Sequence, residues 1–214
     1  MQISASQTYG GGNYYAGAMS FGIQVPALIG FSYQPLLGKI ILDSGATCSM
    51  GAVDLLTYVQ EQFYKNGIVL NTRKAQNLTF SFANGTEDTS TETFPIPIID
   101  MRMVLSFRVL NAPGPILLGE DAHESLKLVI DHETGEVWSK TLHRGFKAEK
   151  LGSGHLVIDV CNEDSLRVLS VPDFKADLVN ALERDHQGFG VDCVQYKESM
   201  HTSTQAQYEH HKEK

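Results

Sequence analysis

One tripeptide of this chain, Asp43-Ser44-Gly45, combines residue types that could do chemistry. It follows the apolar run Ile40-Ile41-Leu42, which has the length and β-branching of a buried strand. A carboxylate at the end of a buried strand is costly to keep charged unless it has a use. The hydroxyl of Ser44, the freedom of Gly45 to turn sharply and the small side chain of Ala46 are expected to leave the carboxylate accessible.

Two such carboxylates can supply an acid and a base together. When they lie about 3 Å apart, like charges prevent both from ionising, and the pair shares one proton. One member then activates water while the other protonates the carbonyl oxygen of an amide. Asp43-Ser44-Gly45 occurs once in the sequence. The second carboxylate is therefore expected from a second copy of the chain, across a two-fold axis.

Two motifs carry a resemblance to a known family. The segment IILDSGAT, residues 40–47, resembles the active-site signature of aspartic proteases, in the Ser variant common among retrotransposon enzymes. About 70 residues later, PILLGED, residues 115–121, resembles the family's second hallmark of aliphatic residues followed by Gly. The match covers about residues 36–140 and resembles a retropepsin-like protease domain of a retrotransposon polyprotein, of copia type.

The resemblance implies roles for individual residues. Asp43 would be the catalytic aspartate, and Ser44 would brace the two active-site loops across the dimer. Gly45 and Ala46 would lie beside the substrate, and Gly119 would pack behind the active-site loop. These implications describe a homodimeric aspartic endopeptidase that cleaves a polypeptide, with no cofactor and no metal.

The predicted fold class is all-β, a retropepsin-like half-barrel with one or two short helices and less ordered N- and C-terminal extensions. Apolar spacing predicts helices over residues 54–65 and 120–126. Asn84-Gly85 predicts a hairpin, because both residues tolerate positive φ. The polar segment 87–93 is the expected flap, and residues 94–99, with two prolines, suit an edge or rim strand. Asp121 is interpreted as a helix-start carboxylate that faces backbone N–H groups.

Composition divides the chain into three parts. Residues 1–35 are uncharged and rich in Gly, Tyr, Ser and Gln, and the first 20 are interpreted as a flexible low-complexity arm. Residues 21–38 are more apolar and could add an edge strand. Residues 36–140 form the expected protease domain. Residues 141–214 are an expected C-terminal extension with one amphipathic helix, over residues 173–184, and a disordered tail.

Charge and cysteine content narrow the class of protein. The net charge of −8 without a Lys/Arg cluster argues against nucleic-acid binding by this segment. Three scattered cysteines are too few for a disulfide scaffold, so an intracellular, reducing compartment such as the cytoplasm is expected. No run of about 18 apolar residues predicts a transmembrane helix. The Cys and His residues do not have zinc-site spacing.

Two functions of different classes are compatible with these patterns. The first is an aspartic endopeptidase that matures a polyprotein. The alternative is a catalytically silent retropepsin-like module that serves dimerisation or peptide binding. Asp43 argues for the first, because a decayed copy is free to lose it, whereas a flap segment without glycines argues for the second.

Overall fold

The computed structural model describes residues 2–9, 12–20, 36–82 and 85–184. This part of the chain is mostly β-sheet with a few short helices. Its elements, in chain order, are β1 (Gln2–Tyr9), β2 (Gly12–Ser20), β3 (Lys39–Leu42), β4 (Met50–Ala52), α1 (Val53–Lys65), β5 (Arg73–Phe82), β6 (Glu87–Ile98), η2 (Ile99–Met101), β7 (Met103–Leu110), β8 (Ile116–Leu118), α2 (Glu120–Leu126), β9 (Leu128–Ile130), β10 (Glu136–Ser139), β11 (Arg144–Lys147), β12 (Glu149–Lys150), β13 (Leu156–Asp159), α3 (Glu163–Val168) and α4 (Pro172–Arg184).

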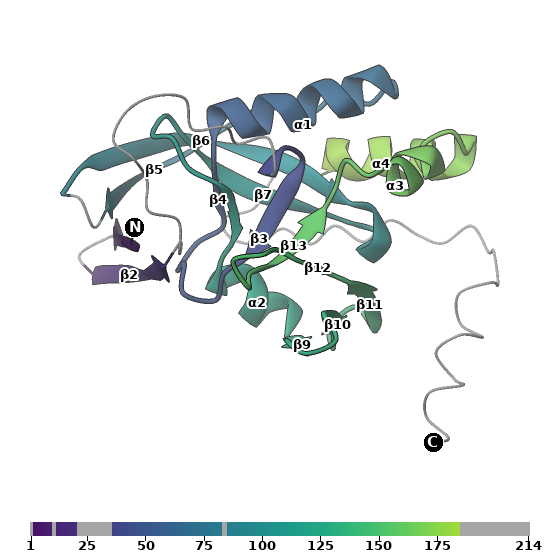
Figure 1. The fold of residues 1–214 in the computed structure, drawn as a ribbon. Coiled ribbons are helices and arrows are strands. Elements are labelled where there is room, and N and C mark those ends of the chain that lie inside the picture. The colour runs from purple at the N-terminus through teal and green to yellow at the C-terminus, as the bar shows by residue number, and fades with distance from the viewer. Residues whose placement is uncertain (1, 10–11, 21–35, 83–84, 185–214) are drawn as a thin grey trace.

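Ten of the described strands form one mixed sheet, in the order β12-β13-β3-β8-β4-β7-β6-β5-β1-β2 (Figure 1). Strand β3 runs parallel to β8, and β4 runs parallel to β7. The hairpin of β5 and β6 is antiparallel, and so is the pair of β6 and β7. Strands β9, β10 and β11 form a separate small sheet. The sheet therefore brings the two sequence motifs, which end β3 and β8, onto neighbouring strands.

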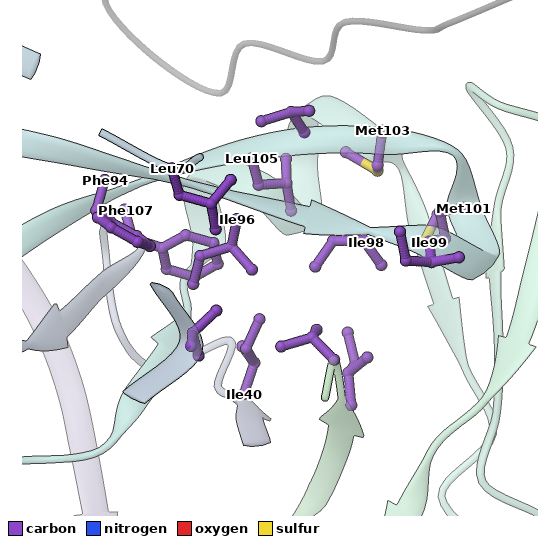
Figure 2. Close-up of a cluster of buried hydrophobic side chains, with 14 of the residues drawn as sticks. Ile40, Leu70, Phe94, Ile96, Ile98, Ile99, Met101, Met103, Leu105 and Phe107 are labelled. Atoms are coloured by element: carbon purple, nitrogen blue, oxygen red, sulfur yellow. The ribbon is translucent and has the colours of Figure 1, made fainter. Parts of the chain in front are cut away.

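The main core lies between the long β6–β7 pair, the helices and strand β3. Figure 2 shows side chains of β6 and β7 on one side of this core and Ile40 of β3 on the other. Helix α1 contributes its apolar stripe, and α4 contributes a second one. The largest fully buried side chains of this cluster are Ile40, Leu56, Phe63, Ile68, Leu70, Phe94, Ile96, Ile98, Met103 and Phe107.

A second apolar cluster lies on the opposite face of β3. Ile41 of β3 and Leu117 of β8 pack there with Val157 of β13, and the hairpin strand β5 adds Leu78 and Phe80. Alternation along β3 explains the division, because successive side chains of a strand point to opposite faces. The residue two positions after Ile41 is Asp43, which the same alternation directs toward this second cluster.

The helices predicted from apolar spacing are present as α1, α2 and α4. In α1 the spacing buries one face, formed by Leu55, Leu56, Val59 and Phe63. Gly67 adopts a φ of 72° directly after the helix, the left-handed conformation that ends helices. The short helix α3 and the 3-10 turn η2 were not predicted. Within the described residues, no helix has the length and apolarity to cross a membrane.

Strand β6 contains residues 94–98, which were predicted to form an edge or rim strand, and only this half of β6 fits that prediction. As a whole β6 lies between β5 and β7, so it is an interior strand. Its pairing with β5 covers residues 87–93, whereas its pairing with β7 covers residues 93–98. Pro95 and Pro97 therefore lie where β6 has one paired neighbour among the described strands. Such a position tolerates a residue that has no N–H to donate.

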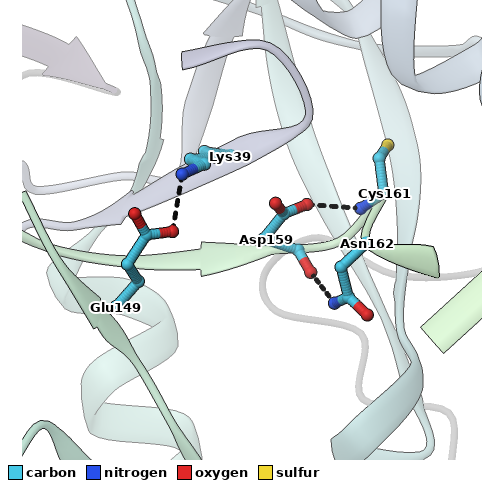
Figure 3. Close-up of polar contacts among 5 residues, drawn as sticks. All are labelled: Lys39, Glu149, Asp159, Cys161 and Asn162. Atoms are coloured by element: carbon cyan, nitrogen blue, oxygen red, sulfur yellow. Dashed lines mark hydrogen bonds and ion pairs between the residues drawn. The ribbon is translucent and has the colours of Figure 1, made fainter. Parts of the chain in front are cut away.

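Strands β12 and β13, which follow residue 140, belong to the ten-stranded sheet, whereas residues 141–214 were predicted to be a C-terminal extension of the protease domain. Strand β13 pairs antiparallel with β3, the strand that leads to Asp43. Lys39 of β3 and Glu149 of β12 form an ion pair, with 2.5 Å between Nζ and Oε2 (Figure 3). Helix α4 buries Leu178 in the main core. The amphipathic helix was thus predicted correctly, but its attachment to the core domain was not.

The N-terminal region differs from its prediction as well. Residues 2–9 and 12–20 form strands β1 and β2, and β1 pairs with β5, whereas the sequence predicted a flexible arm. Most of the possible edge strand over residues 21–38 lies outside the described residues, and so does the predicted C-terminal tail.

Candidate active site

Asp43 lies where β3 ends and a tight turn begins. Its backbone N–H donates to the carbonyl of Leu118 at 3.0 Å, which continues the parallel β3–β8 ladder by one step. Its own carbonyl accepts the N–H of Ala46 at 3.1 Å and closes the turn. The N–H of Gly45 donates to Asp43 Oδ1 at 3.0 Å. One carboxylate oxygen is therefore held by the turn that the sequence Asp-Ser-Gly-Ala forms.

Gly119 packs directly behind this turn. A Cβ atom at this position would lie 2.4 Å from the carbonyl carbon of Cys48 and 2.8 Å from the carbonyl oxygen of Ala46. The next residue, Glu120, donates its N–H to the same Ala46 carbonyl at 2.6 Å. Such a close approach of two backbones requires glycine. The expected packing of the Ile-Leu-Leu-Gly run against the Asp43 turn is present.

A buried polar network joins the turn to helix α2. Ser49 is 1 % exposed, and both its N–H and its hydroxyl donate to Asp121 Oδ1 at 2.9 Å. The same hydroxyl accepts the N–H of Gly119 at 3.0 Å. Asp121 Oδ1 also accepts the N–H of Ala122 at 2.8 Å. Asp121 thus faces backbone N–H groups, as interpreted from the sequence, and it fixes the turn rather than facing Asp43 as a partner.

The second carboxylate oxygen of Asp43 is in a different situation. Oδ2 is buried and has no hydrogen-bond partner within the described residues. Burial raises the pKa of Asp43 above the usual range of an aspartic acid, while the Gly45 N–H and the nearby His155 and His123 act in the opposite direction. A raised pKa makes this carboxyl easier to protonate than an ordinary aspartic acid, which suits a member of a pair that shares one proton.

The other predicted site residues lie around Asp43 with differing exposure. The side chain of Ser44 is exposed, so its hydroxyl is open to contact from another chain. Gly45 is half-buried. Ala46, which was expected beside the substrate, is 1 % exposed and packs in the second apolar cluster with Ile41. Its side chain supports the turn, and only Gly45 retains the position expected for substrate contact.

The predicted flap segment forms the second strand of a hairpin. Residues 87–93 make up the first half of β6 and pair with β5, with Ser81 opposite Glu87. The hairpin turn therefore falls before residue 87, and Gly85 in it has a φ of 81°. The Asn-Gly hairpin prediction is confirmed at this point, but the tip of any flap is the turn itself and not the segment 87–93.

Three residues near Asp43 were not found from the sequence as parts of the site. Ser49 connects the turn to Asp121, and His123 and His155 both act electrostatically on Asp43. His123 lies on α2, and His155 precedes β13. The two histidines are distant from Asp43 in the chain, and Ser49 acts through Asp121, 72 positions away, so no local pattern indicated these residues. Within the described residues, no group of three metal-ligating side chains converges.

Comparison with known proteins does not identify a family. No protein-family model matches the chain, and no curated protein and no solved structure shows significant similarity to it.

Proposed function

We propose that the chain is an aspartic endopeptidase whose catalytic carboxylate is Asp43. One observation carries this proposal: Asp43 lies at the end of β3 and is joined to the parallel strand β8, whose Gly119 passes behind the turn. Two strands that end side by side hold a short turn in a fixed shape, which is what a catalytic carboxylate needs. The finer fold assignment, a retropepsin-like half-barrel, belongs to the same proposal.

The second carboxylate of the proposed site comes from a second copy of the chain. Asp121, the other nearby acid, already accepts three hydrogen bonds on one oxygen and is committed to the turn. A two-fold axis beside the exposed Ser44 would bring two Asp43 turns together. The pair would share one proton, so that one carboxylate activates water and the other protonates the scissile carbonyl.

The substrate of this proposed enzyme is an extended polypeptide, such as the polyprotein that contains the domain. Alternation along β3 directs the side chain of Asp43 toward the cluster in which Leu78 and Phe80 of the β5–β6 hairpin lie with Ile41. A strand-like peptide between this hairpin and the Asp43 turn would find backbone groups and apolar side chains on the same face. Both are features by which proteins bind extended peptides.

A peptide-library digestion over mildly acidic to neutral pH, with and without pepstatin, tests the proposal. Wild-type protein should cleave, and both pepstatin and the substitution Asp43→Asn should abolish cleavage. An amide can neither share the proton of the pair nor act as a base. Asp54→Asn is the matched control, because Asp54 is an exposed carboxylate on α1. Cleavage that survives in Asp43→Asn would contradict the assignment.

Mixing experiments test the shared site separately. When wild-type chains exchange with Asp43→Asn chains, activity should fall below the wild-type fraction, because mixed dimers hold one competent carboxylate. Strict proportionality, with subunit exchange demonstrated, would mean that each chain carries its own complete site.

One observation favours the alternative of a catalytically silent module. Asp43 Oδ2 is buried within the single chain, whereas an attacking water has to reach the carboxylate. A module of this kind would bind an extended peptide or pepstatin and leave it intact. Binding without cleavage, unaffected by the Asp43→Asn substitution, would support this second function.

A further inference from the structure

The ladder between β13 and β3 places a histidine opposite Asp43. In this antiparallel pair, Ile158 is opposite Ile40 and Val157 is opposite Ile41. Continued by two residues, the same register sets His155 against Asp43. Side chains that lie directly opposite in an antiparallel pair have Cβ atoms about 5 Å apart and point to the same face. His155 is half-buried, and its Nδ1 lies 2.9 Å from Ser153 Oγ, which fixes the ring.

A second histidine approaches from helix α2. The backbone of Leu118 hydrogen-bonds to the ring of His123, and the carbonyl of the same residue accepts the N–H of Asp43. Among the residues that the structure describes, His123 Nε2 is buried without a hydrogen-bond partner, as Asp43 Oδ2 is. In the neutral ring that donates from Nδ1 to a carbonyl, Nε2 carries the lone pair and is the atom that takes up a proton.

We propose that His155 and His123 are positioning residues that, once protonated, keep the Asp43 carboxylate ionised and thereby set the lower pH limit of catalysis. The effect on catalysis rests on the proposed function, whereas the effect on the ionisation of Asp43 does not. The proton on each ring comes from solvent, and the positive charge favours the ionised form of the nearby Asp43 carboxyl, which opposes the effect of burial on its pKa.

The surroundings of Asp43 and His123 are consistent with histidines that lower the pKa of Asp43. Burial lowers the pKa of His123, while Leu118, Asp121, Asp43 and Glu120 oppose that shift. Burial raises the pKa of Asp43, and among charged groups His155 and His123 lower it again. Asp121 is already held by Ser49. Without either imidazole, less positive charge would oppose the effect of burial on the pKa of Asp43. Asp43 would then take up its proton at a higher pH.

The ionisation of Asp43 can be measured directly by carbon-13 NMR of the aspartate carboxyl groups. The Asp43 signal is assigned by its absence in Asp43→Asn. We expect its titration midpoint to rise by roughly half a pH unit or more in His155→Gln and in His123→Gln, and further in the double variant. His132→Gln is the matched control, because His132 is an exposed histidine in the β9–β10 turn and should leave the midpoint unchanged. His123→Asn replaces His123→Gln if the longer amide prevents folding.

The same variants are then assayed for peptide cleavage. The acid limb of kcat/KM should move to higher pH in His155→Gln and His123→Gln, whereas a purely structural loss would lower activity at every pH and leave the position of the limb unchanged. An Asp43 midpoint that is the same in wild type and in both variants would overturn the proposal. Shifted midpoints together with an unshifted acid limb would overturn the role in catalysis. Shifted midpoints in a protein that cleaves nothing would support the electrostatic role and refute the proposed function instead.

Discussion

Replacement of Gly119 by alanine tests the close approach on which the proposed site depends. The added Cβ would meet three backbone atoms, namely the carbonyl carbon of Cys48 at 2.4 Å, its oxygen at 2.7 Å and the carbonyl oxygen of Ala46 at 2.8 Å. None of these atoms can turn away as the end of a flexible side chain would. Gly119 has a φ of −83°, so alanine fits the local backbone and the effect is purely steric.

The cost can be worked from the contacts that must be lost. Insertion of a methyl group into a well-packed region costs about 1–3 kcal/mol. Moving the two backbones apart also weakens the bonds from Gly119 N–H to Ser49 and from Glu120 N–H to Ala46, each worth about 1 kcal/mol. We therefore expect a loss of about 3 kcal/mol in the free energy of unfolding. In a chain of this length that corresponds to a fall in Tm of roughly 6–12 °C.

Thermal unfolding followed by circular dichroism measures this loss. Gly152→Ala is the control, because nothing lies within 4 Å of a Cβ built at that position. It should change stability by no more than about 0.5 kcal/mol. If Gly119→Ala melts within about 2 °C of wild type, the two backbones are not as close as described, and the support for the Asp43 turn is lost.

Three further predictions follow from the same contacts. Asp43→Asn should raise the Tm at neutral pH, because burial raises the pKa of Asp43 and the ionised carboxylate therefore destabilises the folded state. This gain in Tm should disappear as the pH falls toward about 3, where the wild-type carboxyl is protonated. Thermal melts of both proteins across this pH range measure the difference in Tm. Ser49→Ala should cost about 2 kcal/mol in urea unfolding, since it leaves the Gly119 N–H without its acceptor and removes one of the three hydrogen bonds on Asp121 Oδ1, whereas Ser170→Ala at an exposed hydroxyl should cost less than about 0.5 kcal/mol. A chain that ends at Arg184 should unfold cooperatively by calorimetry, but one that ends at Lys140 should not, because it lacks β13 and α4; a cooperative transition in the shorter chain would restore a domain boundary at that point.

Features that depend on neighbouring residues could be predicted from the sequence. Helix α1 shows its apolar stripe within 13 residues, and Gly85 lies in the turn between β5 and β6. The turn at Asp43 is of this kind too, because the apolar run before it and the glycine after it are adjacent in the chain. The packing of Ile116–Gly119 against this turn was predicted from two motifs with the same aliphatic-then-small character, whereas the pairing of β3 with β8 was not.

Features that depend on long-range pairing could not be predicted in this way. Ser49 and Asp121 are joined by two hydrogen bonds, although 72 positions separate them. A serine and an aspartate are common in loops, and nothing in their spacing indicates a shared buried site. Ala46 was misjudged for the same reason, because its small side chain suits an open turn as well as a packed one. The second apolar cluster decides whether the turn at Ala46 is open or packed, and this cluster forms only when β3, β5 and β8 come together.

The position of β13 places residues after Lys140 beside the strand that carries Asp43. Strand β13, Leu156–Asp159, lies in the part of the chain that was predicted to be a C-terminal extension, but it pairs with β3. Strand β3 then has β8 on one side and β13 on the other, so the carboxylate at its end is enclosed by residues from both. The register of this pairing, continued by two residues, sets His155 opposite Asp43. The chain after residue 140 therefore contributes both to the packing of the strand that carries Asp43 and to the charge that acts on its carboxylate, and a shorter domain would have neither.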